Sequence, residues 1–451
     1  MTPRTTTIPY TPSPEWESVN PRPLLPIHPH PNLSTLKTSP LPSPPRPTTF
    51  YSTSNATYLL STHLIPGAYP RLVPDIPRPE IPQYTPGGSP GERQRMMADL
   101  ARSVIERQAS FTGGKLGVGL GEKALWNCVN RYVRTGGAGG GGVTLFLAHA
   151  NGFPKEIWET MLRSLLDSPA GSMIEEVWSW EAAQHGDSAL INAENLSGIF
   201  DWMDNARDIA NFLLSYLPEE VKSEVLPTRL ERLPESVSEA RKEHGYRSRK
   251  IVVVGHSFGG CTSVRAALSF PKLFSSIILV DPVIVQGHTY PSDYLYSRVF
   301  GAFSRRERWA SREEALSLFK RSSFFNTWNP EVLQLYVDHG LADDRKDGGV
   351  KLKMSGLHEG LCFANCQTPY EVWELLDKVD ENITLRWVVP KDGIMSEEAT
   401  RSRVWRRPAN ASNVVFHFAG HLIVQEAPAE LAQDVSDFLL RKYGSRSKAM
   451  L

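Results

Sequence analysis

A serine with glycines close on both sides follows a short β-branched run in IVVVGHSFGGCTSV, residues 251–264. Within it, GHSFG fits the pattern Gly-x-Ser-x-Gly, in which a serine at a sharp turn between a strand and a helix projects its hydroxyl beyond a sheet. The glycines remove Cβ atoms that would clash in such a turn. The pattern also occurs in plain turns, but the apolar residues before it and the helical pattern after it favour Ser257 as a nucleophile.

A serine hydroxyl is a weak nucleophile and needs a neighbouring base. Among the 12 histidines, His421 follows a predicted last strand and precedes the last helical pattern. In the chain order Ser, acid, His, the base belongs at that place. His417 lies within the predicted strand, and His256 lies in the serine turn, where its side chain is expected to point away from the hydroxyl. We therefore expect His421 to be the base.

Two carboxylates are candidates for the acid that orients this histidine. Asp281 ends the apolar segment SSIILV, and Asp392 follows ITLRWVV within PKDGIMS. Asp392 also fits a plain turn, because Pro-Lys-Asp-Gly is a good turn sequence, and Asp281 also fits a helix cap. Either side chain can reach the loop of His421, because all three loops leave the same edge of the predicted sheet.

Acyl transfer also requires two donors for an oxyanion. One is the backbone N–H of Phe258, directly after the serine, and the other is expected in the loop HANGFP at 149–154. Gly152 permits a turn with inward N–H groups, so we expect the N–H of Phe153 to be the second donor. His149 is expected to brace this loop by hydrogen bonding.

The elements around these residues alternate between short apolar strands and helical patterns, which indicates a mostly parallel sheet covered by helices on both faces. Strands are predicted at 124–133, 143–150, 174–180, 250–255, 275–281, 383–389 and 413–418. Helical patterns are predicted at 93–108, 158–166, 202–217 and 427–443. Between the strands near 280 and 383, amphipathic helices predominate, and they predict a cap over the strand ends.

Composition divides the chain further. Fourteen of the 35 prolines lie in the first 50 residues, and such a segment is expected to be disordered or polyproline-like. The predicted parts are a proline-rich arm at 1–50, an N-terminal extension at 51–119, a first core part at 120–286 with a charged, solvated insertion at 218–249, a helical cap at 287–380, a second core part at 381–445 and a tail at 446–451.

The overall charge excludes some partners. Lysine and arginine total 49, as do aspartate and glutamate, so neither nucleic acid nor an anionic membrane is expected as the main partner.

The compartment is indicated by other features of the sequence. Four cysteines in 451 residues do not make a disulfide framework and favour a reducing compartment. No apolar run is long enough to span a membrane, and the start does not resemble a signal peptide. No motif for a cofactor or a metal is expected to function as such.

Together, GHSFG, HANGFPKE, HGDS at 185–188 and GHLIVQEAP at 420–428 resemble the α/β-hydrolase superfamily over about residues 120–445. HANGFPKE and WNPEVLQLYVDHGL narrow the resemblance to fungal peroxisomal lipase-like and toxin-biosynthesis hydrolases. The resemblance implies an α/β-hydrolase fold with a helical cap. In the narrower group the acid follows the sixth strand, as in LVDPVI, which favours Asp281, whereas the superfamily at large favours the position of Asp392. The loop WEAAQHGDS departs from the superfamily pattern by lacking an arginine.

These residues predict a serine hydrolase that cleaves an ester or thioester of a small or lipid-like apolar substrate through an acyl-enzyme. The alternatives are a carbon–carbon bond or lactone hydrolase of secondary metabolism, and a non-catalytic ligand-binding protein on the same fold. The oligomeric state is not indicated. The expected location is the cytoplasm, or the peroxisome, because Ala449 and Leu451 fit the small-basic-leucine import pattern although Met450 replaces its basic residue.

Overall fold

The computed structural model of the chain describes residues 4–32, 35, 40–53, 56–82, 89–116, 123–136, 142–289 and 292–444. The predicted tail at 446–451, with its import pattern, lies outside the described residues. Among the described residues, no helix combines the length and the apolar character needed to cross a membrane.

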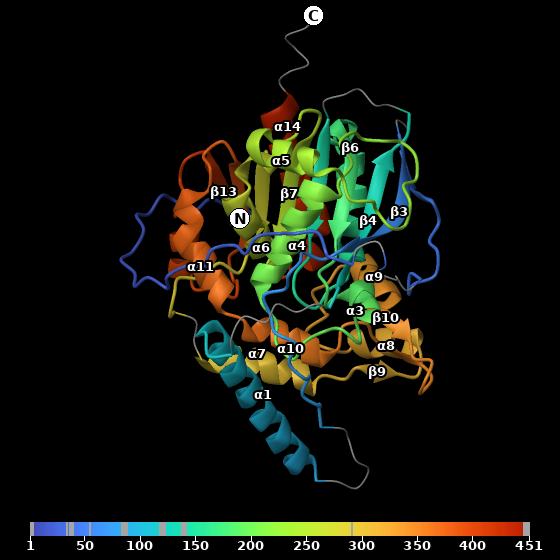
Figure 1. The fold of residues 1–451 in the computed structure, drawn as a ribbon, viewed down its shortest axis with the longest axis vertical. Helices are drawn as coiled ribbons and strands as arrows, with labels where there is room; N and C mark the ends of the chain where they lie inside the picture. Colours follow the sequence, from blue (N-terminus) through green and yellow to red (C-terminus); the bar gives the residue numbers. More distant parts are fainter. Residues whose placement is uncertain are drawn as a thin grey trace, which may run out of the picture.

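A ten-stranded sheet forms the centre of the molecule (Figure 1). Its six central strands are parallel, and the outer strands at both edges are antiparallel to their neighbours. In sheet order the strands are β1 (Thr5–Thr6), β13 (Ala411–Phe416), β12 (Thr384–Pro390), β8 (Ser276–Val280), β7 (Lys250–His256), β5 (Val143–Ala148), β6 (Ile174–Trp180), β4 (Trp126–Arg134), β3 (Thr57–Pro66) and β2 (Thr49–Ser52).

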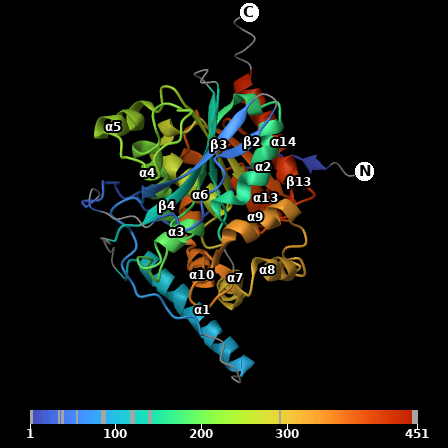
Figure 2. The same ribbon diagram turned by 90° about the vertical axis from the view of Figure 1, so that its right-hand side faces the viewer.

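Both faces of the central strands are buried, because successive side chains of a strand point to opposite sides. In β7, Ile251 and Val253 contribute to one apolar core, whereas Val252 and Val254 contribute to the other. Figure 2 shows the sheet between two layers of helices. One layer contains α4 (Trp202–Ser215), α5 (Glu235–His244) and α6 (Phe258–Ser269), and the other contains α2 (Glu159–Asp167) and α14 (Pro428–Tyr443).

The sequence-based prediction of a mostly parallel sheet covered on both faces is confirmed. All seven predicted strands occur, each within two residues of its predicted ends. The antiparallel strands β1, β2 and β3, of which β1 and β2 are the two edges of the sheet, were not predicted, because they lie in segments where proline and polar residues obscure the alternating pattern.

The segment predicted as a cap lies over the carboxyl ends of the parallel strands. It is not wholly helical, because it also holds a three-stranded antiparallel sheet. Its elements are α7 (Ser292–Ser304), β9 (Arg308–Trp309), α8 (Arg312–Phe319), α9 (Pro330–Gly340), β10 (Leu341–Asp343), β11 (Val350–Leu352), α10 (Gly356–Ala364), α11 (Gln367–Leu375) and the 3-10 helix η4 (Leu376–Lys378). From the N-terminal extension, α1 (Pro90–Thr112) packs beneath α7 and α10 (Figure 1).

The remaining helices are short and connect the core strands. They are η1 (Lys155–Trp158), η2 (Gly171–Met173), α3 (Gly186–Ile191), η3 (Pro271–Leu273), α12 (Glu397–Val404) and α13 (Ile423–Glu426). The charged segment 218–249 is largely exposed, as expected of an insertion, but α5 within it buries Arg241. The Arg241 guanidinium donates to the carbonyls of Leu213 and Leu214 at the end of α4, which fixes the insertion to the core.

The described part of the proline-rich arm, expected to be disordered or polyproline-like, makes side-chain contacts with the core and the cap. Arg22 donates to Glu371 of α11 and to Asp201, the N-cap of α4, and both acceptor carboxylates are fully buried. Trp16 packs edge to face on Trp373, with ring centroids 5.4 Å apart. Prolines remove backbone donors but leave carbonyls and neighbouring side chains free to bind, so the arm lies along the core and joins the cap to it.

We predict that Arg22→Met lowers the free energy of unfolding by about 3 kcal/mol, because it leaves two buried carboxylates without their cation. Arg4→Met is the matched control in the same arm, since Arg4 pairs with Glu430 at an exposed position, with side chains 73% and 41% exposed. Its loss should cost less than about 1 kcal/mol. Equal effects of the two variants in urea unfolding would contradict this account of the arm.

Candidate active site

Ser257 occupies the turn between β7 and α6 with φ 52° and ψ −115°. A positive φ is uncommon for a residue with a side chain and occurs where surrounding bonds impose it. Here the N–H of Ser257 donates to the Val280 carbonyl at 3.0 Å, and its own carbonyl accepts from Cys261 and Val283. These bonds hold the serine hydroxyl beyond the end of the sheet, as the sequence pattern predicts.

Glycines are required around this turn because backbones approach closely there. A Cβ at Gly259 would lie 2.4 Å from the carbonyl oxygen of Ala148, at the end of β5. A Cβ at Gly255 would lie 2.6 Å from the Cα of Gly260. Any larger residue at these positions would push α6 away from the strands that hold the serine.

Three predicted residues form a hydrogen-bonded chain at this edge of the sheet. The Nε2 atom of His421 lies 3.0 Å from the Oγ atom of Ser257, and its Nδ1 atom lies 2.6 Å from an oxygen of Asp281. Asp281 follows β8 and is fully buried. The His421 side chain remains 19% exposed, so it borders open space while its position is fixed from both sides.

The other candidate acid, Asp392, does not take part in this chain. It lies in the loop after β12 and is exposed. Among the described residues, no hydrogen bond or ion pair involves its carboxylate. The structure therefore brings Asp281, and not Asp392, to the far nitrogen of His421.

A buried arginine that we did not predict accompanies Asp281. Arg403 of α12 forms an ion pair with the Asp281 carboxylate and donates to the carbonyl of Pro282. Burial alone would raise the pKa of Asp281, but the charge of Arg403 and the hydrogen bond from His421 outweigh it and lower the pKa to about 2. The carboxylate is thus charged across the physiological range. Nothing in the sequence around Arg403 marks it as a partner of Asp281, 122 residues away.

Two further histidines considered in the sequence, His256 and His417, bind other groups and are not part of this hydrogen-bonded chain. Among the described residues, no hydrogen bond joins His256 to the serine hydroxyl, and its Nε2 atom lies 2.8 Å from the backbone carbonyl of His421. Burial lowers the pKa of His256 to about 3, so it is neutral and donates this bond. The Nε2 atom of His417 lies 2.7 Å from the hydroxyl of Thr6 in the arm.

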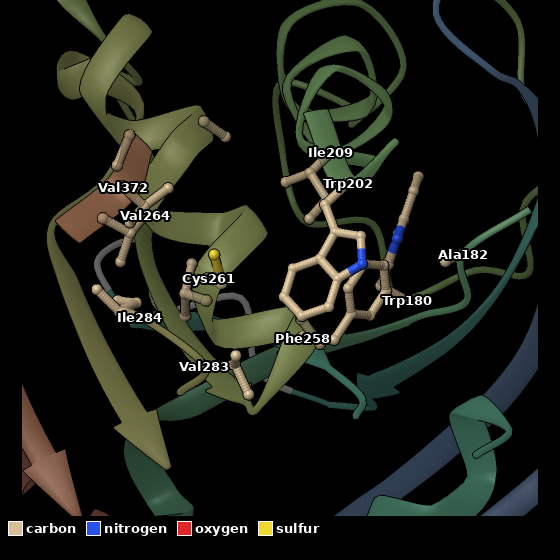
Figure 3. Close-up of a cluster of buried hydrophobic side chains, with 14 of the residues drawn as sticks. Trp180, Ala182, Trp202, Ile209, Phe258, Cys261, Val264, Val283, Ile284 and Val372 are labelled. Carbon is tan, nitrogen blue, oxygen red and sulfur yellow. The ribbon is translucent and has the colours of Figure 1, made fainter. Parts of the chain in front are cut away.

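The two predicted oxyanion donors belong to the residue directly after the serine and to the loop after β5. Gly152 has φ +91°, which turns the loop before Phe153. Among the described residues, the backbone N–H groups of Phe153 and Phe258 donate to no protein acceptor, which leaves both available to a ligand. The Phe258 ring packs edge to face against Trp202 at 4.8 Å (Figure 3), which fixes the start of α6.

His149 braces the loop before Phe153, as expected. Its Nδ1 atom lies 2.8 Å from the Ala150 carbonyl, and its Nε2 atom accepts from the N–H of Ala182 at 3.2 Å. The N–H of Gly259 in α6 donates to the His149 carbonyl at 3.1 Å. Burial lowers the pKa of His149 to about 4, so its ring acts as a neutral spacer between two backbone segments.

A buried charge cluster, formed by Lys155, Asp187 and Lys353, ties this loop to the cap. The Asp187 carboxylate accepts from the ammonium of Lys155 at 2.8 Å and from that of Lys353 at 2.6 Å. It also accepts from the hydroxyl of Ser43 in the arm at 2.7 Å. The backbone N–H of Lys155 donates to Glu181 at 3.1 Å. One ionic network therefore joins the segment HANGFPKE, the segment WEAAQHGDS and the cap.

Asp187 also belongs to the one grouping of possible metal ligands among the described residues. Ligand atoms of Cys128, Glu181 and Asp187 all lie within 4.8 Å of one another. The ammonium of Lys155 already lies 3.5 Å from Glu181 and 2.8 Å from Asp187. Burial raises the pKa of the Cys128 thiol well above its usual range, which disfavours the thiolate a metal would need. The chemistry of this set therefore suits an ammonium rather than a metal ion.

A cavity of about 830 Å³ opens above Ser257 and His421, between the sheet and the cap. This volume suits a drug-sized or lipid-like molecule. Most of its wall is apolar or aromatic, and it includes Phe153, Trp202, Val283, Phe319, Phe325 and Leu422. The serine hydroxyl and the histidine thus face an apolar space large enough for a substrate.

Comparison with known proteins agrees with this architecture. Residues 145–434 match the alpha/beta hydrolase family, a span of more than half of the chain. The chain belongs to the alpha/beta hydrolase family. Among solved structures, this hydrolase is similar in fold to the peroxisomal alpha-beta-hydrolase Lpx1 of Saccharomyces cerevisiae, with a TM-score of 0.56 and 21% identity over 71% of this chain and 83% of that one.

Curated relatives of this alpha/beta hydrolase come from fungi. The peroxisomal membrane protein LPX1 of Saccharomyces cerevisiae is 25% identical over 50% of this chain and 57% of its own length. The type I acyl-CoA thioesterase mpaH of Penicillium brevicompactum is 28% identical over 45% of this chain and 40% of its own length. The chain therefore spans about half of the length of the curated relatives it matches.

We predict that the buried pair of Asp281 and Arg403 stabilises this hydrolase in a pH-dependent way. The folded-state pKa of Asp281, about 2, lies below its usual value of 3.8. The ionised carboxylate therefore adds about 2 kcal/mol to the free energy of unfolding above about pH 4, and this contribution is lost as the pH falls toward 2. Urea unfolding at pH 6, 4 and 2.5 should show a gap between the wild type and Asp281→Asn that narrows below pH 4. Asp392→Asn, at the exposed carboxylate, should follow the wild type, and a gap that stays constant would contradict the prediction.

Proposed function

We propose that this protein is a serine hydrolase that cleaves an ester or thioester of an apolar substrate through an acyl-enzyme. The hydrogen-bonded chain from Ser257 through His421 to the buried Asp281, facing the cavity, is the observation that carries the proposal. Family membership supports hydrolysis in general. The relative named as an acyl-CoA thioesterase supports thioesters among the bonds to test.

The proposed reaction begins with transfer of the Ser257 proton to Nε2 of His421 as Oγ attacks the carbonyl carbon. Asp281 stabilises the imidazolium that forms. The N–H groups of Phe258 and Phe153 bind the negative oxygen of the tetrahedral intermediate. When this intermediate collapses, the alcohol or thiol leaves with the proton from His421. Water then attacks the acyl-enzyme by the same sequence and releases the acid.

The first prediction from this proposal concerns the nucleophile. Ser257→Ala should abolish hydrolysis of a panel of aryl esters and thioesters, because among the described residues Ser257 supplies the one hydroxyl that is hydrogen-bonded to the His421 ring. A fluorophosphonate probe should label the wild type and not the variant. The melting temperature should stay nearly unchanged, since Oγ is a small group at the end of the sheet. Equal labelling of both proteins would exclude Ser257, and a wild type that binds these substrates without cleaving them would favour a ligand-binding protein.

The matched pair Asp281→Asn and Asp392→Asn assigns the acid within the same assay. Loss of the carboxylate that orients the base typically lowers kcat by about 10⁴. We expect a loss of that order for Asp281→Asn and a change of less than threefold for Asp392→Asn. Because Asp281 also pairs with Arg403, the assay is run below the melting temperature of each variant. A large loss for Asp392→Asn alone would reverse the assignment.

A peroxisomal location is part of the proposal. The yeast relative is named as a peroxisomal protein, and Ala449 and Leu451 fit two of the three positions of the import pattern. A fluorescent protein fused ahead of the whole chain should co-localise with peroxisomes in a fungal cell, and removal of residues 449–451 should make it diffuse. Diffuse fluorescence of the intact fusion would place the protein in the cytoplasm instead.

A further inference from the structure

One face of helix α7 forms a wall of the cavity above Ser257. Its lining residues recur at spacings of three and four, as expected for one side of a helix. They are Tyr294, Arg298, Gly301 and Ala302, followed by Arg305 directly after the helix ends. Two guanidinium groups are thus set one above the other in a wall that is otherwise mainly apolar.

The charge of Arg298 opposes the rise in the pKa of the buried Glu359 carboxylate, but the two groups form no ion pair. Among the described residues, no hydrogen bond or ion pair involves the Arg298 guanidinium, whose central carbon lies 4.7 Å from the ring centroid of Tyr294. The side chain is half-buried and borders the cavity. A guanidinium is rarely kept in such a place without an anionic partner, because it loses hydration there and gains little from an aromatic ring alone.

The other arginines of the cavity are paired. Arg305 forms an ion pair with Glu359 of α10, which lies in the same wall. Arg306 donates to Glu314 at 2.9 Å, at an exposed position. Arg298 therefore differs from both neighbours in having no ion-pair partner among the described residues, although Glu359 lies within electrostatic range of it.

Space for a ligand group exists beside Arg298. A Cβ at Gly301 would have no heavy atom within 4 Å, so the wall is open between Arg298 and Arg305. A planar or tetrahedral anion in this gap would contact the unpaired guanidinium of Arg298. The ion pair of Arg305 and Glu359 would lie on the other side of the anion. Guanidinium groups bind carboxylate and phosphate oxygens through two parallel N–H bonds, which gives such a contact direction as well as strength.

We propose that Arg298, beside the gap at Gly301, binds an anionic oxygen group of the substrate while the rest of the substrate occupies the apolar cavity. The proposal rests on the proposed function, and it adds that the substrate is an amphiphilic anion rather than a neutral lipid. Two sources share this chemistry: a carboxylate on the acyl part, or a phosphate on the leaving group. Arg298 is then a residue that selects the substrate and takes no part in bond cleavage.

The test compares matched thioesters that differ in charge at one end. The octanoyl thioester of N-acetylcysteamine is neutral, the octanedioyl monothioester adds a carboxylate to the acyl part, and octanoyl-CoA adds phosphates to the leaving group. The quantity compared is the kcat/KM for an anionic substrate divided by the kcat/KM for the neutral one. For one of the two anionic substrates, we expect this ratio to be about tenfold or more lower in Arg298→Gln than in the wild type. The substrate whose ratio falls identifies the source of the anion.

Arg306→Gln is the matched control, because it removes an arginine of the same cavity that already has a carboxylate partner. Its ratio should change by less than threefold. Arg298→Lys should give an intermediate ratio, since it keeps the charge and loses the paired N–H bonds. Equal losses for neutral and anionic substrates in Arg298→Gln, or equal ratios for Arg298→Gln and Arg306→Gln, would overturn the proposal.

Failure of the proposed function gives a separate result. If the wild type cleaves none of the thioesters, calorimetric titration of the same three compounds decides the inference by binding alone. Tighter binding of an anionic compound by the wild type than by Arg298→Gln then supports the anion site without hydrolysis. Equal affinities of the two proteins for all three compounds would remove it.

Discussion

The backbone conformation of Ser257 is the constraint on which the rest of the site depends. A residue with a side chain at positive φ costs about 1–3 kcal/mol and persists where its neighbours over-determine it. Here the neighbours are the ends of β5, β7 and β8, which approach closely because Gly255, Gly259 and Gly260 lack side chains. Ser257 lines the cavity and Phe258 follows it as the first residue of α6, so a shift of α6 would displace both.

The neighbouring strand end shows a second positive φ, 36° at Asp281. Its N–H donates to the Val388 carbonyl of β12 at 2.8 Å, and its side chain is held between Arg403 and His421. The ends of β8 and β12 thus fix the backbone of Asp281, while a buried cation and the histidine hold its carboxylate. The open space around the site lies on the cap side, where a substrate has to enter.

Much of this arrangement could be predicted from the sequence because it is local. The β-branched runs define the parallel strands, and the glycine pattern defines the turn at Ser257 within a few residues. Ser257 and His421 could be predicted because each follows a strand that the sequence pattern already identifies. The choice between Asp281 and Asp392 could not be made from local pattern, since both follow a predicted strand, and it depends on which carboxylate the fold turns toward His421.

Features that depend on distant pairs were not predicted. The arm was expected to be disordered or polyproline-like because its prolines exclude regular hydrogen bonding, and the bond from Arg22 to Glu371, 349 residues later, was not predicted. Arg403 and the cluster of Lys155, Asp187 and Lys353 likewise join segments that no periodicity connects. Charged residues in a sequence usually indicate solvent-exposed positions, and only the fold shows which of them are buried with a partner.

The contact between the arm and the far edge of the sheet also bears on how the chain is assembled. Thr6 and His417 meet although they are 411 residues apart in the sequence. A ribosome adding about 5–20 residues per second needs tens of seconds to make the strand that the arm completes. Until then the arm has no edge to pair with and Arg22 has no Glu371. The first residues therefore cannot dock until nearly all of the chain has been made.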